Sequence, residues 1–189
     1  MSAFLRFAAV TVLALCAAGA GTAAEVGGVK LDDKISLSGQ ELVLNGAGVR
    51  TRVVFKVYVA SLYLPQPAKD LSAVLGKGPR RIQMNMLRTL AADQLVDALN
   101  EGLAENNAPA ELAAVKPQAD QLASIMKAFK EVKEKDVVAL DFVDGGTRVS
   151  LNGEAKGAIP GEPFNQALTR IWLGDKPVQA DLKKALLGG

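Results

Sequence analysis

Histidine is absent from the 189-residue chain, and its single cysteine, Cys16, stands near the N-terminus. Histidine is the commonest general base and metal ligand of enzymes, so its absence argues against histidine-based catalysis. Within residues 25–189 a zinc site would have to do without both histidine and cysteine, its preferred side chains. We therefore expect no metal and no cofactor, and we assign no catalytic residue.

A dominant sign of charge is also lacking, because 22 lysines and arginines face 20 aspartates and glutamates. No strongly basic tract of the kind that contacts nucleic acid stands out, and there is no acidic tail. The composition therefore argues against nucleic acid as a partner.

The first 24 residues are typical of a signal peptide. Arg6 is their only charge, an apolar run follows over residues 7–18, and small residues lead up to Ala24. The run is shorter than the about 20 residues of a membrane span. We predict cleavage after Ala24, with Ala20 as the alternative, a periplasmic location, and no membrane span once the signal is removed.

Cys16 raises the alternative of a lipid anchor at the cleavage point. Leu15, directly before it, is bulky where lipoprotein signals usually have a small residue. This favours a cysteine inside the signal-peptide core. The exported chain would then fold without a disulfide.

Residues 25–189 are enough for one domain with a core of its own. Their first half is typical of strands, with apolar runs at 26–31 and 35–46 divided by turn residues. Residues 46–50 are interpreted as a glycine-rich turn that enters one long strand at 51–65. Alternation in this strand puts Tyr58 on the face of Arg50, Arg52 and Lys56. The pattern inverts beyond Ser61, which predicts a bulge or a change of neighbouring layer near Ala60 and Ser61.

The second half mixes helices and strands. We expect a short helix within 68–78, a strand at 79–89, a helix with Thr89 as N-cap, and a second helix with Pro117 near its first turn. Residues 136–154 predict a hairpin that turns at Asp144, Gly145 and Gly146. Residues 156–189 are interpreted as two closing helices. Grouped strands and helices predict an α+β domain on a mostly antiparallel sheet.

Three blocks, "LNGAGVR" leading into "FKVYVASLYLP", "KGAIPGEPFNQALTRIWLG" and "PVQADLKKALLG", resemble the chalcone isomerase-like superfamily, and specifically its bacterial exported branch. The resemblance covers about residues 26–188, and so implies that residues 25–189 are one chalcone isomerase-like domain. It implies an open-faced β-sandwich, in which helices lie over one face of a large antiparallel sheet and a cleft lies between the layers. In plant isomerases that cleft closes a flavonoid ring, and in non-catalytic plant relatives a similar cavity holds a fatty acid.

The family arginine follows the pattern G-x-G-x-R, which "GAGVR" matches with Arg50. A guanidinium can hold a carboxylate or phenolate with two parallel hydrogen bonds. The resemblance thus implies Arg50 as a ligand anchor. The alternative is a turn arginine that caps nearby carbonyls or pairs with a surface carboxylate.

The other isomerase positions do not match. Tyr58 stands where the plant enzymes have a threonine, Ala91 and Ala98 fall near their tyrosine and asparagine, and Ile171 falls near their last hydroxyl residue, with Thr169 close by. These differences argue against flavonoid cyclisation. The Tyr58 hydroxyl is our second ligand-binding candidate, against the alternative of an interior tyrosine bonded to backbone.

Several other side chains have an ordinary explanation. Lys56 is expected to face solvent, and Phe164 and Trp172 to fill the core. Three methionines could line a lipid cavity or simply fill the core: Met84, Met86 and Met126. Three aspartates fit a strand and its turn better than a metal site: Asp136, Asp141 and Asp144.

We therefore expect a non-catalytic, exported protein that binds a small lipophilic acid, such as a fatty acid, in a cleft anchored by Arg50. The first alternative is an isomerase, an intramolecular lyase of unknown substrate. The second is an accessory protein that contacts a partner through its surface.

Overall fold

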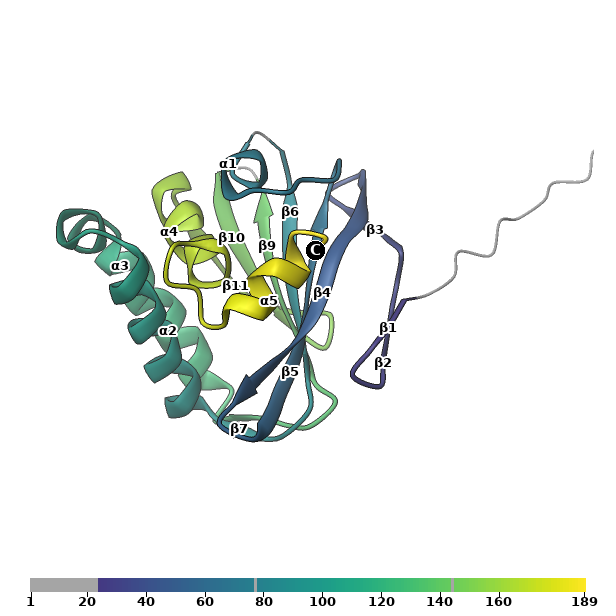
Figure 1. Ribbon diagram of the computed structural model, residues 1–189. Helices are drawn as coiled ribbons and strands as arrows, with labels where there is room; N and C mark the ends of the chain where they lie inside the picture. Colours follow the sequence, from purple (N-terminus) through teal and green to yellow (C-terminus); the bar gives the residue numbers. More distant parts are fainter. Residues whose placement is uncertain (1–23, 77, 144) are drawn as a thin grey trace, which may run out of the picture.

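A computed structural model describes residues 24–76, 78–143 and 145–189 (Figure 1). The predictions for residues 1–23, including Cys16, and for Asp144 lie outside these residues. Within the described part of the chain, no helix is both long enough and apolar enough to cross a membrane.

The described residues form a seven-stranded antiparallel sheet and two small two-stranded sheets. In spatial order the large sheet consists of β11 (Glu154–Pro160), β10 (Gly146–Leu151), β9 (Val137–Val143), β6 (Arg80–Met86), β5 (Phe55–Leu64), β4 (Gln40–Arg52) and β3 (Lys34–Leu37). The small sheets pair β1 (Ala24–Val26) with β2 (Val29–Leu31) and β7 (Leu90–Ala91) with β8 (Glu131–Val132). The predicted α+β class and antiparallel sheet are confirmed.

Helices cover one face of this sheet (Figure 1). They are α1 (Leu71–Val74), α2 (Ala92–Asn106), α3 (Pro109–Ala128), α4 (Glu162–Leu173) and α5 (Ala180–Leu186). The main core lies between the two layers, where Leu62 and Ile82 of the sheet join the same buried cluster as Phe164 and Trp172 of α4. The expected core role of these two aromatic residues is confirmed.

The long strand predicted at 51–65 is in fact a hairpin. Residues 46–50 lie within β4 and are not a turn, and the chain reverses at Val53 and Val54. The reversal was missed because neither turn residue is a glycine, asparagine or proline, and alternation alone does not show where a strand ends. Arg50 and Tyr58 nevertheless share a face, since they are directly opposed across β4 and β5.

The pattern inversion beyond Ser61 reflects a change of neighbouring layer. The register irregularities lie in β4, between Leu44 and Gly46 and between Arg50 and Thr51, so the bulge predicted near Ala60 and Ser61 is wrong. Residues 59–64 of β5 are all buried, because the sheet carries a core on both faces there. The second, smaller core gathers Tyr63 with three aliphatic residues: Leu37, Leu42 and Val143.

Two helix starts differ from the prediction. The N-cap of α2 is Ala91, not Thr89, whose hydroxyl accepts a hydrogen bond from the Glu134 amide at 3.2 Å. The first turn of α3 contains Pro109, and Pro117 lies inside the helix. Both N-caps are alanines that lack a capping oxygen. A side chain three residues further on accepts from the N-cap amide instead: Gln94 in α2 and Glu111 in α3.

The closing segment contains a strand that the sequence reading assigned to a helical region. Residues 154–160 form β11, which includes Gly157 and Pro160. Both residue types are poor strand formers, so the segment carries a weak strand signal. β11 is an edge strand, where a proline without a donor is tolerated. The two helices that follow, α4 and α5, are as predicted.

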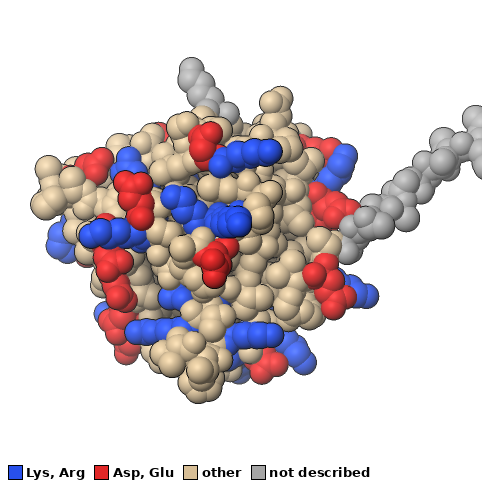
Figure 2. Space-filling model, viewed as in Figure 1, with Lys and Arg blue, Asp and Glu red and all other residues tan. Residues whose placement is uncertain are grey.

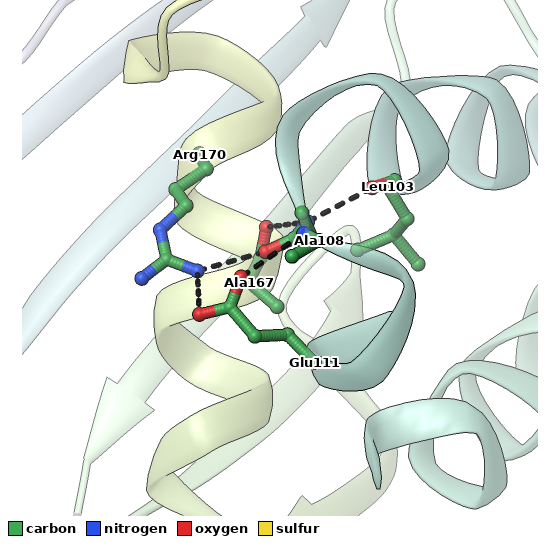
Figure 3. Close-up of polar contacts among 6 residues, drawn as sticks. Leu103, Ala108, Glu111, Ala167 and Arg170 are labelled. Atoms are coloured by element: carbon green, nitrogen blue, oxygen red, sulfur yellow. Dashed lines mark hydrogen bonds and ion pairs between the residues drawn. The ribbon is translucent and has the colours of Figure 1, made fainter. Parts of the chain in front are cut away.

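The junction between α2 and α3 is tied to α4 by a polar cluster (Figure 3). The buried Asn107 side chain donates to the carbonyls of Leu103 and Ala167 at 2.9 and 3.3 Å. Arg170 of α4 donates to the Asn107 side-chain oxygen at 2.9 Å and to the Glu111 carboxylate at 3.3 Å. These bonds fix the C-terminal end of α2 against α4, and with it the helix face that borders the site described below.

Glycines 46 and 48 allow α5 to lie directly on β4. A Cβ atom on Gly46 would lie 2.1 Å from the Ala185 carbonyl oxygen, and one on Gly48 would lie 2.9 Å from the Ala185 Cβ atom. Asn45, directly before Gly46, also contacts this helix: its side-chain nitrogen donates to the carbonyls of Ala68 and Leu186 at 3.0 and 2.7 Å. The glycine pair therefore serves close packing of helix on strand.

This packing predicts an energetic coupling between strand and helix. Gly48→Ala should destabilise the fold by about 1 to 3 kcal/mol, because its methyl group would overlap the Ala185 side chain. In an Ala185→Gly background the same substitution should be less destabilising. Urea denaturation of the wild type, both single variants and the double variant measures the coupling. Strictly additive effects would contradict the proposed contact.

Candidate functional site

A basin of about 370 Å³ opens between the β4–β5 hairpin and α2. Its sheet side presents the guanidinium groups of Arg50, Arg52 and Arg88, while its helix side presents the carboxylates of Glu101 and Glu105. The two walls therefore carry opposite charges. An anionic group that enters the basin is attracted to the sheet side.

A second, smaller cavity of about 90 Å³ lies deeper between the sheet and the helices. Apart from Tyr58 and Trp172, apolar side chains line it: among them are Met84, Met86, Met126, Phe129, Leu140 and Ile171. Tyr58, Leu95, Ala98 and Val178 line both spaces, so they form the boundary between them. A charged basin thus borders directly on an apolar cavity.

Tyr58 is the polar group at this boundary. Its hydroxyl oxygen accepts a hydrogen bond from the Trp172 indole nitrogen at 3.1 Å, which leaves its own proton available to a ligand. Burial raises the pKa of Tyr58, and the Trp172 hydrogen bond and the positive charge of Arg50 partly oppose this rise. The side chain is therefore a neutral donor at physiological pH. The favourable effect of burying it neutral declines as the pH rises above about 10.

Arg50 lines the basin and also contacts backbone. One of its terminal nitrogens donates to the Thr51 carbonyl and, at 3.4 Å, to the Gln179 side-chain oxygen. That oxygen also accepts from the Thr51 amide at 2.8 Å, and the Gln179 nitrogen donates to the Val49 carbonyl at 3.4 Å. Gln179 is the N-cap residue of α5. The start of α5 therefore positions the arginine. Arg50 lines the basin, as a ligand anchor would, and it also caps a nearby carbonyl, as in the alternative that the sequence left open.

The sequence reasoning missed Arg88 and Gln179. The Arg88 guanidinium lies 4.7 Å from the centre of the Phe55 ring, and its buried Nε atom has no hydrogen-bond partner. A signal for it exists, because Arg88 continues the alternation of Met84 and Met86 past the end of β6. Gln179 carries no such signal, since its role depends on where α5 begins against β4.

The remaining candidates fall outside the basin or into the cavity wall. Lys56 is exposed, as expected, and the three methionines line the inner cavity. Thr169 is buried away from both spaces, where it donates to the Asn165 carbonyl at 2.7 Å and accepts from Arg80. Ala98 lines the boundary, and Ala91 precedes α2 without lining either space.

The two described aspartates that the sequence assigned to a strand and its turn, Asp136 and Asp141, are engaged by protein groups. Asp141 forms a two-bond ion pair with Arg81, and Asp136 accepts from the Lys133 amide and the Asn152 side chain. Among the described residues, no group of three or more histidine, cysteine, aspartate or glutamate side chains is arranged to hold a metal ion.

Comparisons with known proteins agree with this architecture. The profile of a family described as chalcone isomerase-like matches residues 23–188. Among solved structures, a fatty-acid binding protein of Arabidopsis thaliana superimposes with a TM-score of 0.64 at 14% sequence identity, covering 85% of this chain and 92% of that protein. At this identity the likeness concerns the fold. No curated protein matches the sequence.

The proximity of Arg50 to Tyr58 predicts a measurable shift in acidity. In a Tyr63→Phe background Tyr58 is the one remaining tyrosine. Arg50→Met should then raise the pKa of Tyr58, because the guanidinium favours the tyrosinate anion. Tyrosinate absorbance during alkaline titration measures the shift. Arg52→Met is the matched control and should have a smaller effect; an unchanged or lowered pKa in Arg50→Met would contradict the described site.

Proposed function

Because the chain belongs to the chalcone isomerase-like family, we propose that it is a non-catalytic binder of a small lipophilic acid, such as a fatty acid. The observation that carries the proposal is the junction of a basin bearing guanidinium groups with an apolar cavity, at Tyr58. Such a division suits a ligand with one anionic end and one apolar end.

In this proposal the acid head lies on the sheet side of the basin. There a carboxylate would accept hydrogen bonds from the Arg50 guanidinium and from the Tyr58 hydroxyl, whose proton is not used by Trp172. Arg52 and Arg88 add positive charge around the same space. Glu101 and Glu105 on the opposite wall disfavour an anion there, which restricts the head to one side.

In the same proposal the apolar tail lies in the inner cavity. Burial of an alkyl chain is favourable by roughly 0.8 kcal/mol per methylene group. A space of about 90 Å³ holds the beginning of such a chain, so a longer tail requires the lining to move. Met84, Met86 and Met126 suit this requirement, because methionine has flexible, unbranched side-chain torsions and adapts to irregular shapes.

The proposal extends to the location of the protein. The N-terminal 24 residues have the charge, apolar run and small residues of a signal peptide, which supports export to the periplasm. A purified mature chain that begins at Met1 would contradict the export proposal.

The proposal of binding without catalysis is supported by two alanines. Ala91 and Ala98 carry no hydrogen-bonding side chain where the plant isomerases have a tyrosine and an asparagine, which supports binding without flavonoid cyclisation.

Loss of the Arg50 charge should weaken binding of an acid much more than binding of the matching alcohol. Arg50→Gln is expected to reduce affinity for decanoic acid by roughly 10-fold or more, since a hydrogen bond to a charged group contributes about 1.5 to 3 kcal/mol. Decanol shares the tail without the charge and should bind both proteins about equally. Isothermal titration calorimetry measures both ligands. Equal losses for acid and alcohol would remove Arg50 as the anchor.

Filling the boundary between the two spaces should block the tail. Ala98 lies on α2, is exposed, and lines both basin and cavity, so Ala98→Trp should abolish binding of decanoic acid with little effect on folding. Ala104→Trp, also at an exposed alanine of α2 but outside both spaces, is the matched control. Retained affinity in a folded Ala98→Trp protein would show that the tail lies elsewhere.

A further inference from the structure

The tip of the β4–β5 hairpin exposes three large apolar residues to solvent. Val53, Val54 and Phe55 are 89%, 76% and 56% exposed, and they are the exposed large hydrophobic residues among those described. They project at the end of the sheet near β7 (Figure 1). Scattered apolar residues on a surface are ordinary, but three in succession at a projecting turn are a local apolar patch.

The turn geometry disfavours the residue that stands there. Val53 has a φ of +58°, a left-handed conformation that a β-branched side chain adopts only with strain. Two-residue hairpin loops place glycine, asparagine or aspartate at such positions. Solvent exposure and backbone conformation both therefore argue against valine at this position. Its presence points to a requirement other than folding.

Basic side chains surround the apolar tip. Arg52 and Lys56 are exposed on either side of it, and the Arg88 guanidinium stacks on the Phe55 ring at 4.7 Å. No acidic residue occurs between Leu44 and Leu64, the stretch that contains the whole hairpin tip. In the space-filling view, blue side chains flank the uncharged projection at the lower end of the molecule (Figure 2).

We propose that this tip docks into the interfacial region of an anionic lipid bilayer. Apolar side chains that project beyond flanking cations match the two layers of such a surface, in which anionic head groups lie above the acyl chains. The cations would contact the head groups while Val53, Val54 and Phe55 enter the boundary below. A narrow projecting turn suits insertion between lipids better than it suits a flat protein interface.

The tip lies next to the basin, so docking of the tip would bring the basin to the lipid surface. Arg52, Val53 and Phe55 line the basin as well as belonging to the tip, so the basin reaches the tip. A docked tip would place this part of the basin at the lipid surface, so a lipophilic acid could pass between bilayer and cavity without crossing bulk water. This second step rests on the proposed function, whereas docking itself does not.

Vesicle flotation tests the docking with a variant that removes the apolar surface and keeps the fold. Val53→Gly combined with Val54→Asn replaces both apolar side chains and supplies the residue types that the turn geometry prefers. The variant should melt at the wild-type temperature or above it. Its affinity for vesicles of phosphatidylcholine mixed with phosphatidylglycerol should fall by roughly 10-fold or more. Every comparison uses the exported form that begins at residue 25, because the apolar run at residues 7–18 would itself bind vesicles and conceal the contribution of the tip.

The charge requirement is tested by Arg52→Gln against Lys69→Gln, an exposed lysine near α1 at the other end of the sheet. Arg52→Gln should weaken binding to the mixed vesicles and Lys69→Gln should not. Wild-type binding should fall with added salt and be weak on phosphatidylcholine alone.

Three outcomes would overturn the proposal: no binding of the wild type to mixed vesicles, equal binding by the Val53→Gly, Val54→Asn variant, or a wild-type dimer that the variant loses while vesicles remain unbound. Decanoic acid binding in vesicle-free solution is measured in parallel. Retained acid binding without vesicle binding would reject docking alone, and vesicle binding without acid binding would reject the proposed function alone.

Discussion

The contact between α5 and β4 determines much of the site, and it depends on two glycines of β4, Gly46 and Gly48, which have no side chain. Only hydrogen atoms at positions 46 and 48 leave room for the backbone and side chain of Ala185. Once α5 lies this close, its N-cap residue Gln179 reaches the end of β4 and bonds to the backbone of Val49 and Thr51, the residues before and after Arg50. The G-x-G-x-R pattern is thereby explained in physical terms: the glycines admit a helix, and the helix orients the arginine.

The polarity of the site changes at Tyr58, which lines both the charged basin and the apolar cavity. On one side of Tyr58 the basin carries guanidinium and carboxylate groups, and on the other the cavity is lined by methionine, leucine and aromatic carbon. The Trp172 indole satisfies the tyrosine oxygen, so the hydroxyl can lie at the boundary without an unpaired acceptor. The polar cluster at Asn107 and Arg170 holds the helix wall in place, which maintains the width of this boundary.

The sequence indicated the class of fold, the antiparallel sheet and the shared face of Arg50 and Tyr58, but the last of these for the wrong reason. Their proximity was inferred from alternation along one strand, whereas they meet by pairing across a hairpin. The hairpin could not be predicted from the sequence pattern, because its turn residues, Val53 and Val54, are of a type that favours strands. Likewise β11 was hidden by Gly157 and Pro160, and the start of α2 by an alanine N-cap. Only for β11 does pairing with a neighbouring strand override the local preference. The exposed hairpin tip and the alanine N-cap simply lack the residue types by which turns and caps are recognised.

The hydrogen bond from Trp172 to Tyr58 has a practical consequence. Trp172 is the only tryptophan of the chain, and its indole borders the inner cavity. The emission of an indole depends on the polarity around it and on the acceptor that its nitrogen contacts. The protein therefore contains a native optical probe at the boundary of its two compartments, whose fluorescence follows the filling of the cavity without a chemical label.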